Sequence, residues 1–198
     1  MTTSAKKIST KEKIIKSALR CFGKGSIEQI KLIDIAKEAG INHSLVLYHY
    51  PNFDDILYAS TQELVKEYIN AFSNLSIKTI SDPEKYLYTF IKTNFELASQ
   101  SKRFRLWLYL YYKSAIDERF QVLLKMVRSH SAARLKDILI SLAKDKKIEL
   151  NDAKINKITS HTLELISGKL IIALSEGGFE LKNLTESVFN SVNNQLPS

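Results

Sequence analysis

The chain contains few residues that end a helix. Three prolines and six glycines occur among its 198 residues, and the long segments between them are rich in Leu, Ile, Lys, Glu and Ala. Most of these residue types favour helices, and no run alternates β-branched and polar residues between turn signals as a half-buried strand would. The sequence therefore predicts an all-α protein.

The composition indicates a globular protein of the cell interior. Hydrophobic residues make up 44% and charged residues 25% of the chain, and no apolar run is long enough to cross a membrane. No apolar leader segment follows Met1. The single cysteine, Cys21, excludes an internal disulfide and is expected in the core of the first helix. These features predict a cytoplasmic protein without a membrane partner.

Positive charge is concentrated near the N-terminus. The net charge of the chain is +8, and +5 of it falls in residues 1–50, where nine Lys and Arg stand against four Asp and Glu. A Lys or Arg that meets a DNA phosphate releases a condensed counterion, which favours binding. The excess therefore fits a DNA-binding segment, although a solvated helix surface has the same composition.

The first helix has clear start and stop signals. Ser9 and Glu12 have the spacing of a capping box, in which each side chain accepts a hydrogen bond from the other residue's backbone N–H. Apolar residues between Ile14 and Phe22 recur at helical spacing, and the glycines at positions 23 and 25 should end the helix. One face of this helix is expected to be buried.

Two shorter helices should follow around a glycine turn. Residues 32–39 have apolar residues at helical spacing and are followed by Gly40, which suits a left-handed cap. Asn42 is a good N-cap for a third helix, which Pro51 stops. Two short helices about such a turn form a helix-turn-helix, and we assign residues 1–52 to this domain.

Residues 53–198 are predicted to form a larger helical domain. Its predicted elements are a connecting helix over about residues 52–77, a helix over 83–97, an aromatic-dense segment over 103–114, and helices over about 117–144, 153–176 and 183–194. The dipeptide Gly177-Gly178 should separate the last two helices.

Three N-terminal segments together resemble the TetR family of transcription regulators. They are the apolar first helix, the segment IAKEAGIN from Ile35 to Asn42, and YHYPN from Tyr48 to Asn52. The resemblance covers roughly residues 10–60 and implies a homodimeric DNA-binding regulator. Such a protein is expected to be a repressor that a small-molecule effector releases from a palindromic operator in double-stranded DNA.

The resemblance places the third helix in the major groove of DNA. The predicted DNA-binding residues are Lys31, Asn42, His43, Ser44, Leu45, Tyr48 and His49. Hydroxyl and imidazole groups can bond to base edges, and a leucine can contact a thymine methyl group.

Three positions depart from the usual pattern of the family. Lys31 stands where members usually have Thr, Leu47 where they have Tyr, and Phe53 where they have Lys. Lys31 can replace the threonine contact to a phosphate, and Tyr48 can replace the displaced tyrosine. Phe53 cannot bind a phosphate and is expected to pack under the fourth helix. This implies weaker anchoring to the DNA backbone unless the basic arm around Lys6, Lys7 and Lys11 compensates.

The family resemblance also implies an effector site and a dimer interface in the larger domain. The predicted ligand-binding residues are Phe90, Phe104, Trp107, Tyr111, His161 and Glu164, and the predicted dimer-interface residues are Leu163, Ser167, Gly168 and Leu170. Aromatic residues at helical spacing also occur in ordinary cores. His161 and Glu164 can instead face the dimer seam or solvent.

Other function classes find less support in the sequence. It contains no glycine-rich phosphate loop, metalloprotease motif or nucleophile elbow, and its four histidines are scattered. We therefore expect no enzymatic activity, cofactor or metal site. A helical adaptor that binds proteins, or a DNA-binding protein without a ligand, is the alternative.

Overall fold

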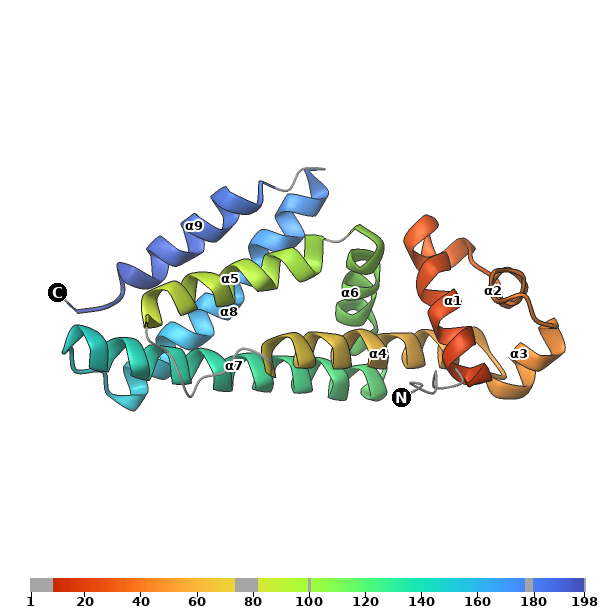
Figure 1. Cartoon of the computed structure of the whole chain (residues 1–198), viewed down its shortest axis with the longest axis horizontal. Coiled ribbons are helices and arrows are strands. Elements are labelled where there is room, and N and C mark those ends of the chain that lie inside the picture. Colours follow the sequence, from red (N-terminus) through yellow and green to blue (C-terminus); the bar gives the residue numbers. More distant parts are fainter. Residues whose placement is uncertain (1–8, 74–81, 100, 177–179, 198) are drawn as a thin grey trace, which may run out of the picture.

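The computed structural model describes residues 9–73, 82–99, 101–176 and 180–197, and the elements within these residues are all helical. They are α1 (Thr10–Lys24), the short 3-10 helix η1 (Ile27–Gln29), α2 (Leu32–Ala39), α3 (His43–His49), α4 (Phe53–Ser73), α5 (Pro83–Ser99), α6 (Ser101–Ser114), α7 (Glu118–Lys146), α8 (Asp152–Ser175) and α9 (Leu181–Asn193). Figure 1 shows an elongated molecule with α1, α2 and α3 at one end. The all-α prediction is confirmed, and the aromatic-dense segment is the helix α6. The predicted end of the connecting helix and the stop at Gly177-Gly178 lie outside the described residues.

The expected caps organise the N-terminal helices. The Ser9 hydroxyl accepts a hydrogen bond from the Glu12 N–H at 3.2 Å, and the Glu12 carboxylate accepts from the Ser9 N–H at 3.1 Å, which completes the capping box of α1. Gly40 ends α2 with φ of 60° and ψ of 44°, the left-handed conformation that costs other residues free energy. Gly25 ends α1 in an extended conformation instead, with φ of −155°.

Polar contacts and a buried core hold α1 against α2. The Arg20 and Lys24 side chains each lie 2.7 Å from the Glu38 carboxylate, and their hydrogen bonds lower the pKa of that group. Cys21 lies in the core as expected, and burial raises the pKa of its thiol. Arg20 and Lys24 therefore stabilise the packing of α1 against α2.

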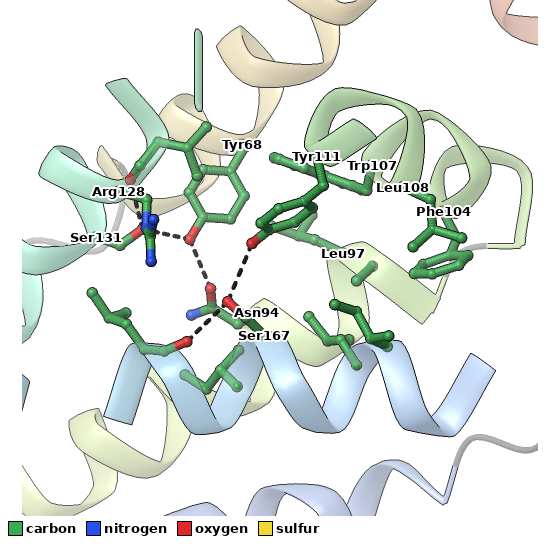
Figure 2. Close-up of a pocket in the computed structure, with 16 residues that line it drawn as sticks. Tyr68, Asn94, Leu97, Phe104, Trp107, Leu108, Tyr111, Arg128, Ser131 and Ser167 are labelled. Carbon is green, nitrogen blue, oxygen red and sulfur yellow. Dashed lines mark hydrogen bonds between the residues drawn. The ribbon is translucent and has the colours of Figure 1, made fainter. Parts of the chain in front are cut away.

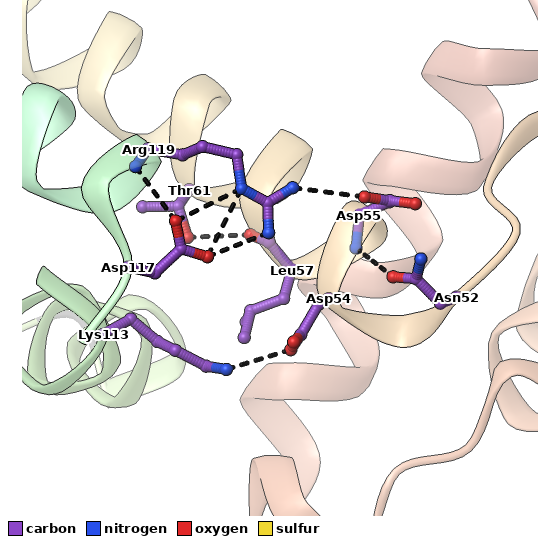
Figure 3. Close-up of polar contacts among 8 residues, drawn as sticks. All are labelled: Asn52, Asp54, Asp55, Leu57, Thr61, Lys113, Asp117 and Arg119. Atoms are coloured by element: carbon purple, nitrogen blue, oxygen red, sulfur yellow. Dashed lines mark hydrogen bonds and ion pairs between the residues drawn. The ribbon is translucent and has the colours of Figure 1, made fainter.

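The first turn of α4 is fastened to the turn between α6 and α7 (Figure 3). Asn52 caps α4 by accepting a hydrogen bond from the Asp55 N–H at 2.9 Å. Lys113, at the end of α6, lies 3.1 Å from the Asp54 carboxylate, and Arg119 of α7 lies 3.3 Å from that of Asp55. Two ion pairs therefore join the start of α4 to the larger helical part.

Helix α6 also packs directly on the N-terminal helices. The Arg105 guanidinium donates a hydrogen bond to the Gly25 carbonyl oxygen at 2.9 Å. The buried apolar side chains form one continuous cluster that extends from Ile14 in α1 to Val192 in α9. The division at residue 52 stays a prediction, because the core does not stop there.

The two glycine caps provide a matched test of the helix-turn-helix geometry. We expect Gly40→Ala to reduce the free energy of unfolding by about 1 kcal/mol, because alanine is strained in the left-handed region. Gly25→Ala should have a much smaller effect, since its backbone is extended and no atom lies within 4 Å of an added Cβ. Urea unfolding of both variants measures the difference, and equal losses would contradict the assigned cap.

Candidate DNA-binding surface and ligand cavity

Helix α3 is anchored by one residue and presents the others outward. Val46 is fully buried, whereas Ser44, Leu45 and Tyr48 are exposed, with Tyr48 at 80%. The Asn42 side chain accepts a hydrogen bond from the Ser44 N–H at 2.9 Å and so caps the helix. The capped N-terminus and its polar side chains can therefore approach a flat or grooved partner at this end of the molecule (Figure 1).

The other predicted DNA contacts lie on or beside the same helix. His43 and His49 are half-buried, and the His49 ring packs edge-on against Tyr48 with centroids 5.1 Å apart. Lys31 is exposed at the start of α2, where its N–H donates to the Asp34 carboxylate at 2.9 Å. Its ammonium group forms no ion pair with any described residue, so it remains available for a phosphate.

The departures from the family pattern have structural explanations. The Phe53 ring packs edge-on against Phe22 of α1, with centroids 5.9 Å apart, and so joins α4 to the N-terminal core. This confirms its expected packing role. Leu47 is partly exposed, at 39%. Lys6 and Lys7 of the basic arm lie outside the described residues.

A cavity of about 80 Å³ opens among α4, α5, α6, α7 and α8 (Figure 2). Phe104, Trp107 and Tyr111, three of the predicted ligand-binding residues, line it from α6. The other lining residues are Tyr68, Asn94, Leu97, Ala98, Leu108, Val127, Arg128, Ser131, Leu163, Ile166, Ser167, Leu170 and Ile171. The walls are thus mostly apolar, with a few polar groups, which is the usual make-up of a small-molecule site.

Buried polar side chains form a hydrogen-bond network at one end of the cavity. The Tyr68 hydroxyl lies 2.7 Å from the Asn94 Oδ1 atom and 2.7 Å from the Ser131 Oγ atom. Burial raises the pKa of Tyr68, so this hydroxyl stays neutral. A separate hydrogen bond of 3.1 Å joins the hydroxyls of Tyr111 and Ser167.

Three predicted ligand residues do not line the cavity. Phe90 is buried in the core against Phe72, with ring centroids 5.2 Å apart. His161 is exposed and its Nδ1 lies 2.8 Å from the Gln195 amide nitrogen, while Glu164 is exposed and accepts from the Ser160 hydroxyl at 3.1 Å. The two polar residues interrupt an apolar sequence because α8 has a solvent face in the monomer.

Sequence reasoning also missed several cavity residues and assigned others differently. Leu163, Ser167 and Leu170, which were predicted at the dimer interface, line the cavity from α8. Asn94 and Arg128 were not predicted there, although a buried asparagine within the apolar pattern of α5 is a signal that could have been used.

One face of α8 remains apolar and open. Ile171 is 46% exposed and Ile172 is 56% exposed, although the sequence around them is that of a core helix. Gly168 lies one turn earlier, and a Cβ added to it would meet no atom of the chain within 4 Å. The surface beside this residue is therefore open to at least a small side chain.

Two negative findings limit the chemistry of the described residues. No group of His, Cys, Asp and Glu within them could hold a metal ion. None of the described helices is long and apolar enough to cross a membrane.

Comparison with known proteins identifies the fold. No family model and no curated protein matches the chain. A TetR transcription regulator from Haloarcula marismortui matches with a TM-score of 0.81 and 19% identity, over 94% of this chain and 98% of that one. A regulator from Saccharomonospora viridis in complex with choline matches with a TM-score of 0.76 and 18% identity, over 94% and 96%.

A third structure is similar over nearly the same length. The transcriptional regulator FadR from Bacillus subtilis in complex with stearoyl-CoA has a TM-score of 0.67 and 16% identity, over 91% of this chain and 96% of that one. At sequence identities as low as these, the similarity shows that the chains share a fold. The chain has the fold of the TetR transcription regulators over almost its whole length.

Proposed function

We propose that this protein is a TetR-type transcription regulator that binds double-stranded DNA as a homodimer. In this proposal it represses genes by occupying a palindromic operator in the cytoplasm, and a small-molecule effector releases it. The observation that carries the proposal is the capped and exposed helix α3, presented at one end of a chain that has the TetR fold over almost its whole length.

The proposed DNA contacts divide into two kinds. Lys31, at the start of α2, would bind a phosphate and position the protein without reading sequence. His43, Ser44 and Leu45 lie in the first turn of α3, which is the part of a recognition helix that meets base edges. Tyr48 is exposed enough to reach the sugar-phosphate backbone. A twofold dimer would present two such helices to two half-sites.

The proposed effector site is the cavity among α4 to α8. Structures of the same fold contain choline in one case and stearoyl-CoA in another, which supports ligand binding by a protein of this fold. At about 80 Å³ the cavity fits a small ligand, and a larger one would have to move its walls. The alternative is a DNA-binding protein that needs no ligand.

Release requires that the ligand and DNA prefer different conformations. A ligand that favours a poor spacing of the two recognition helices must weaken DNA binding, and DNA must weaken ligand binding by the same factor. Coupling energies of this kind are typically about 1 to 3 kcal/mol. Helix α6 can transmit the change, because it lines the cavity and also bonds to Gly25 through Arg105.

A salt titration tests the DNA-binding proposal. We expect affinity for a labelled duplex, measured by fluorescence anisotropy, to fall steeply with salt because counterions are released on binding. Lys31→Ala should weaken binding to all sequences alike and reduce the slope of log affinity against log salt by about 1. His43→Ala should instead change the preference among sequences.

Lys154→Ala is the matched control, since it removes one exposed charge from the start of α8, in the larger helical domain. The proposal predicts that this variant binds nearly as well as the native protein. Affinity that does not depend on salt, or an equal loss from both lysine substitutions, would contradict the assigned surface.

Sedimentation tests the proposed homodimer, in which α8 and α9 would pack against the same helices of the second subunit. We expect the native protein to sediment as a dimer at micromolar concentration and Gly168→Leu to shift it toward monomer, because a larger side chain would obstruct close helix approach. Helix content by circular dichroism should not change, since no atom of the same chain lies within 4 Å of the added Cβ. A native monomer, or a Gly168→Leu dimer as tight as the native one, would oppose the proposal.

A further inference from the structure

The cavity is polar at one end and apolar at the other. Its polar end, defined by Tyr68, Asn94, Arg128 and Ser131, lies on the left in Figure 2, and Phe104 and Leu108 mark the apolar end on the right. A site of this shape matches a ligand with one polar head group and an apolar body. The chemistry of the polar end therefore decides which class of head group it accepts.

The two hydroxyl groups of the polar end already use their protons. The Ser131 hydroxyl lies 2.8 Å from the Val127 carbonyl oxygen, and the Tyr68 hydroxyl lies between Ser131 and the Asn94 Oδ1 atom. The Asn94 amide donates to the Phe90 carbonyl, which fixes its oxygen toward Tyr68. The Val127 oxygen and the Asn94 Oδ1 atom can only accept, so both hydroxyl protons are taken up by contacts within this network. Neither hydroxyl has a proton to spare for a ligand.

Arg128 supplies the donors that these hydroxyls cannot. It follows Val127 on α7 and stands three residues before Ser131, so the two side chains share a helix face. It is exposed and forms no hydrogen bond or ion pair with the described residues. Among the described residues that line the cavity it is also the only charged side chain, and none of them is a carboxylate.

The positive charge of Arg128 determines whether the polar end favours an anionic or a cationic head group. A guanidinium group binds a carboxylate through charge-assisted hydrogen bonds, often two at once. Aromatic rings such as Trp107 and Tyr68 can attract a quaternary ammonium group, but here Arg128 would repel it. The net charge of +8 on the chain acts in the same direction.

We propose that the cavity binds a short amphipathic carboxylate, with its head group on Arg128 and its apolar chain directed toward Phe104. The proposal rests on the effector role of the same cavity. Along α6 the cavity wall runs from Phe104 to Tyr111, seven residues or about 10 Å, which matches an acyl chain of about six to eight carbons. The ligand class is therefore a medium-chain carboxylic acid or a compound with the same two ends.

Three probes of equal chain length test this assignment. Hexanoate, hexan-1-ol and hexylammonium differ only in the head group, and Trp107 is the only tryptophan in the chain and lines the cavity. Titration of its fluorescence in the full-length protein should show hexanoate binding about tenfold more tightly than hexanol, and hexylammonium binding most weakly. Arg128→Gln should lower the hexanoate affinity about tenfold and leave that for hexanol nearly unchanged.

Arg134→Gln is the matched control, because Arg134 lies on the same helix but does not line the cavity. It should keep the preference for the acid. The proposal is overturned if hexanol or hexylammonium binds as tightly as hexanoate, or if the two arginine variants lose the same affinity. The salt titration measures DNA binding without any ligand. A result here that contradicts the acid preference would therefore leave the DNA-binding proposal standing, and the two proposals can fail separately.

Discussion

Helix α6 is packed between the N-terminal helices and the cavity, and the proposed regulation depends on this position. Arg105 bonds to the end of α1 through the Gly25 carbonyl, while Phe104, Trp107 and Tyr111 face the cavity. Packed interiors resist continuous deformation, so a change in the occupancy of the cavity can shift α6 as a unit. Such a shift would move α1 and, with it, the orientation of α3 relative to the second subunit.

Besides the continuous buried core, two polar contacts connect the start of α4 to the turn between α6 and α7. The ion pairs of Lys113 with Asp54 and of Arg119 with Asp55 are partly exposed, and pairs of this kind each contribute about 0 to 1 kcal/mol. They orient the first turn of α4 without locking it.

The N-terminal domain could be predicted from the sequence because its determinants are local. The cap at Gly40 and the N-cap at Asn42 are each set by residues within a few positions. The cavity has no such local signal, because its polar residues come from three different helices. Tyr68 lies 26 residues before Asn94 and 63 residues before Ser131 along the chain. Helical periodicity reports that a residue faces inward, but not which residues of other helices it meets.

The central claim is that two copies of α3 read a symmetric DNA sequence, and selection from random DNA measures this most directly. Full-length protein is incubated with a pool of random duplexes, and bound molecules are recovered, amplified and sequenced. The account predicts enrichment of a palindrome whose half-sites lie about one helical turn or more apart. A pool that stays random after repeated selection, or an enriched site without twofold symmetry, would contradict it.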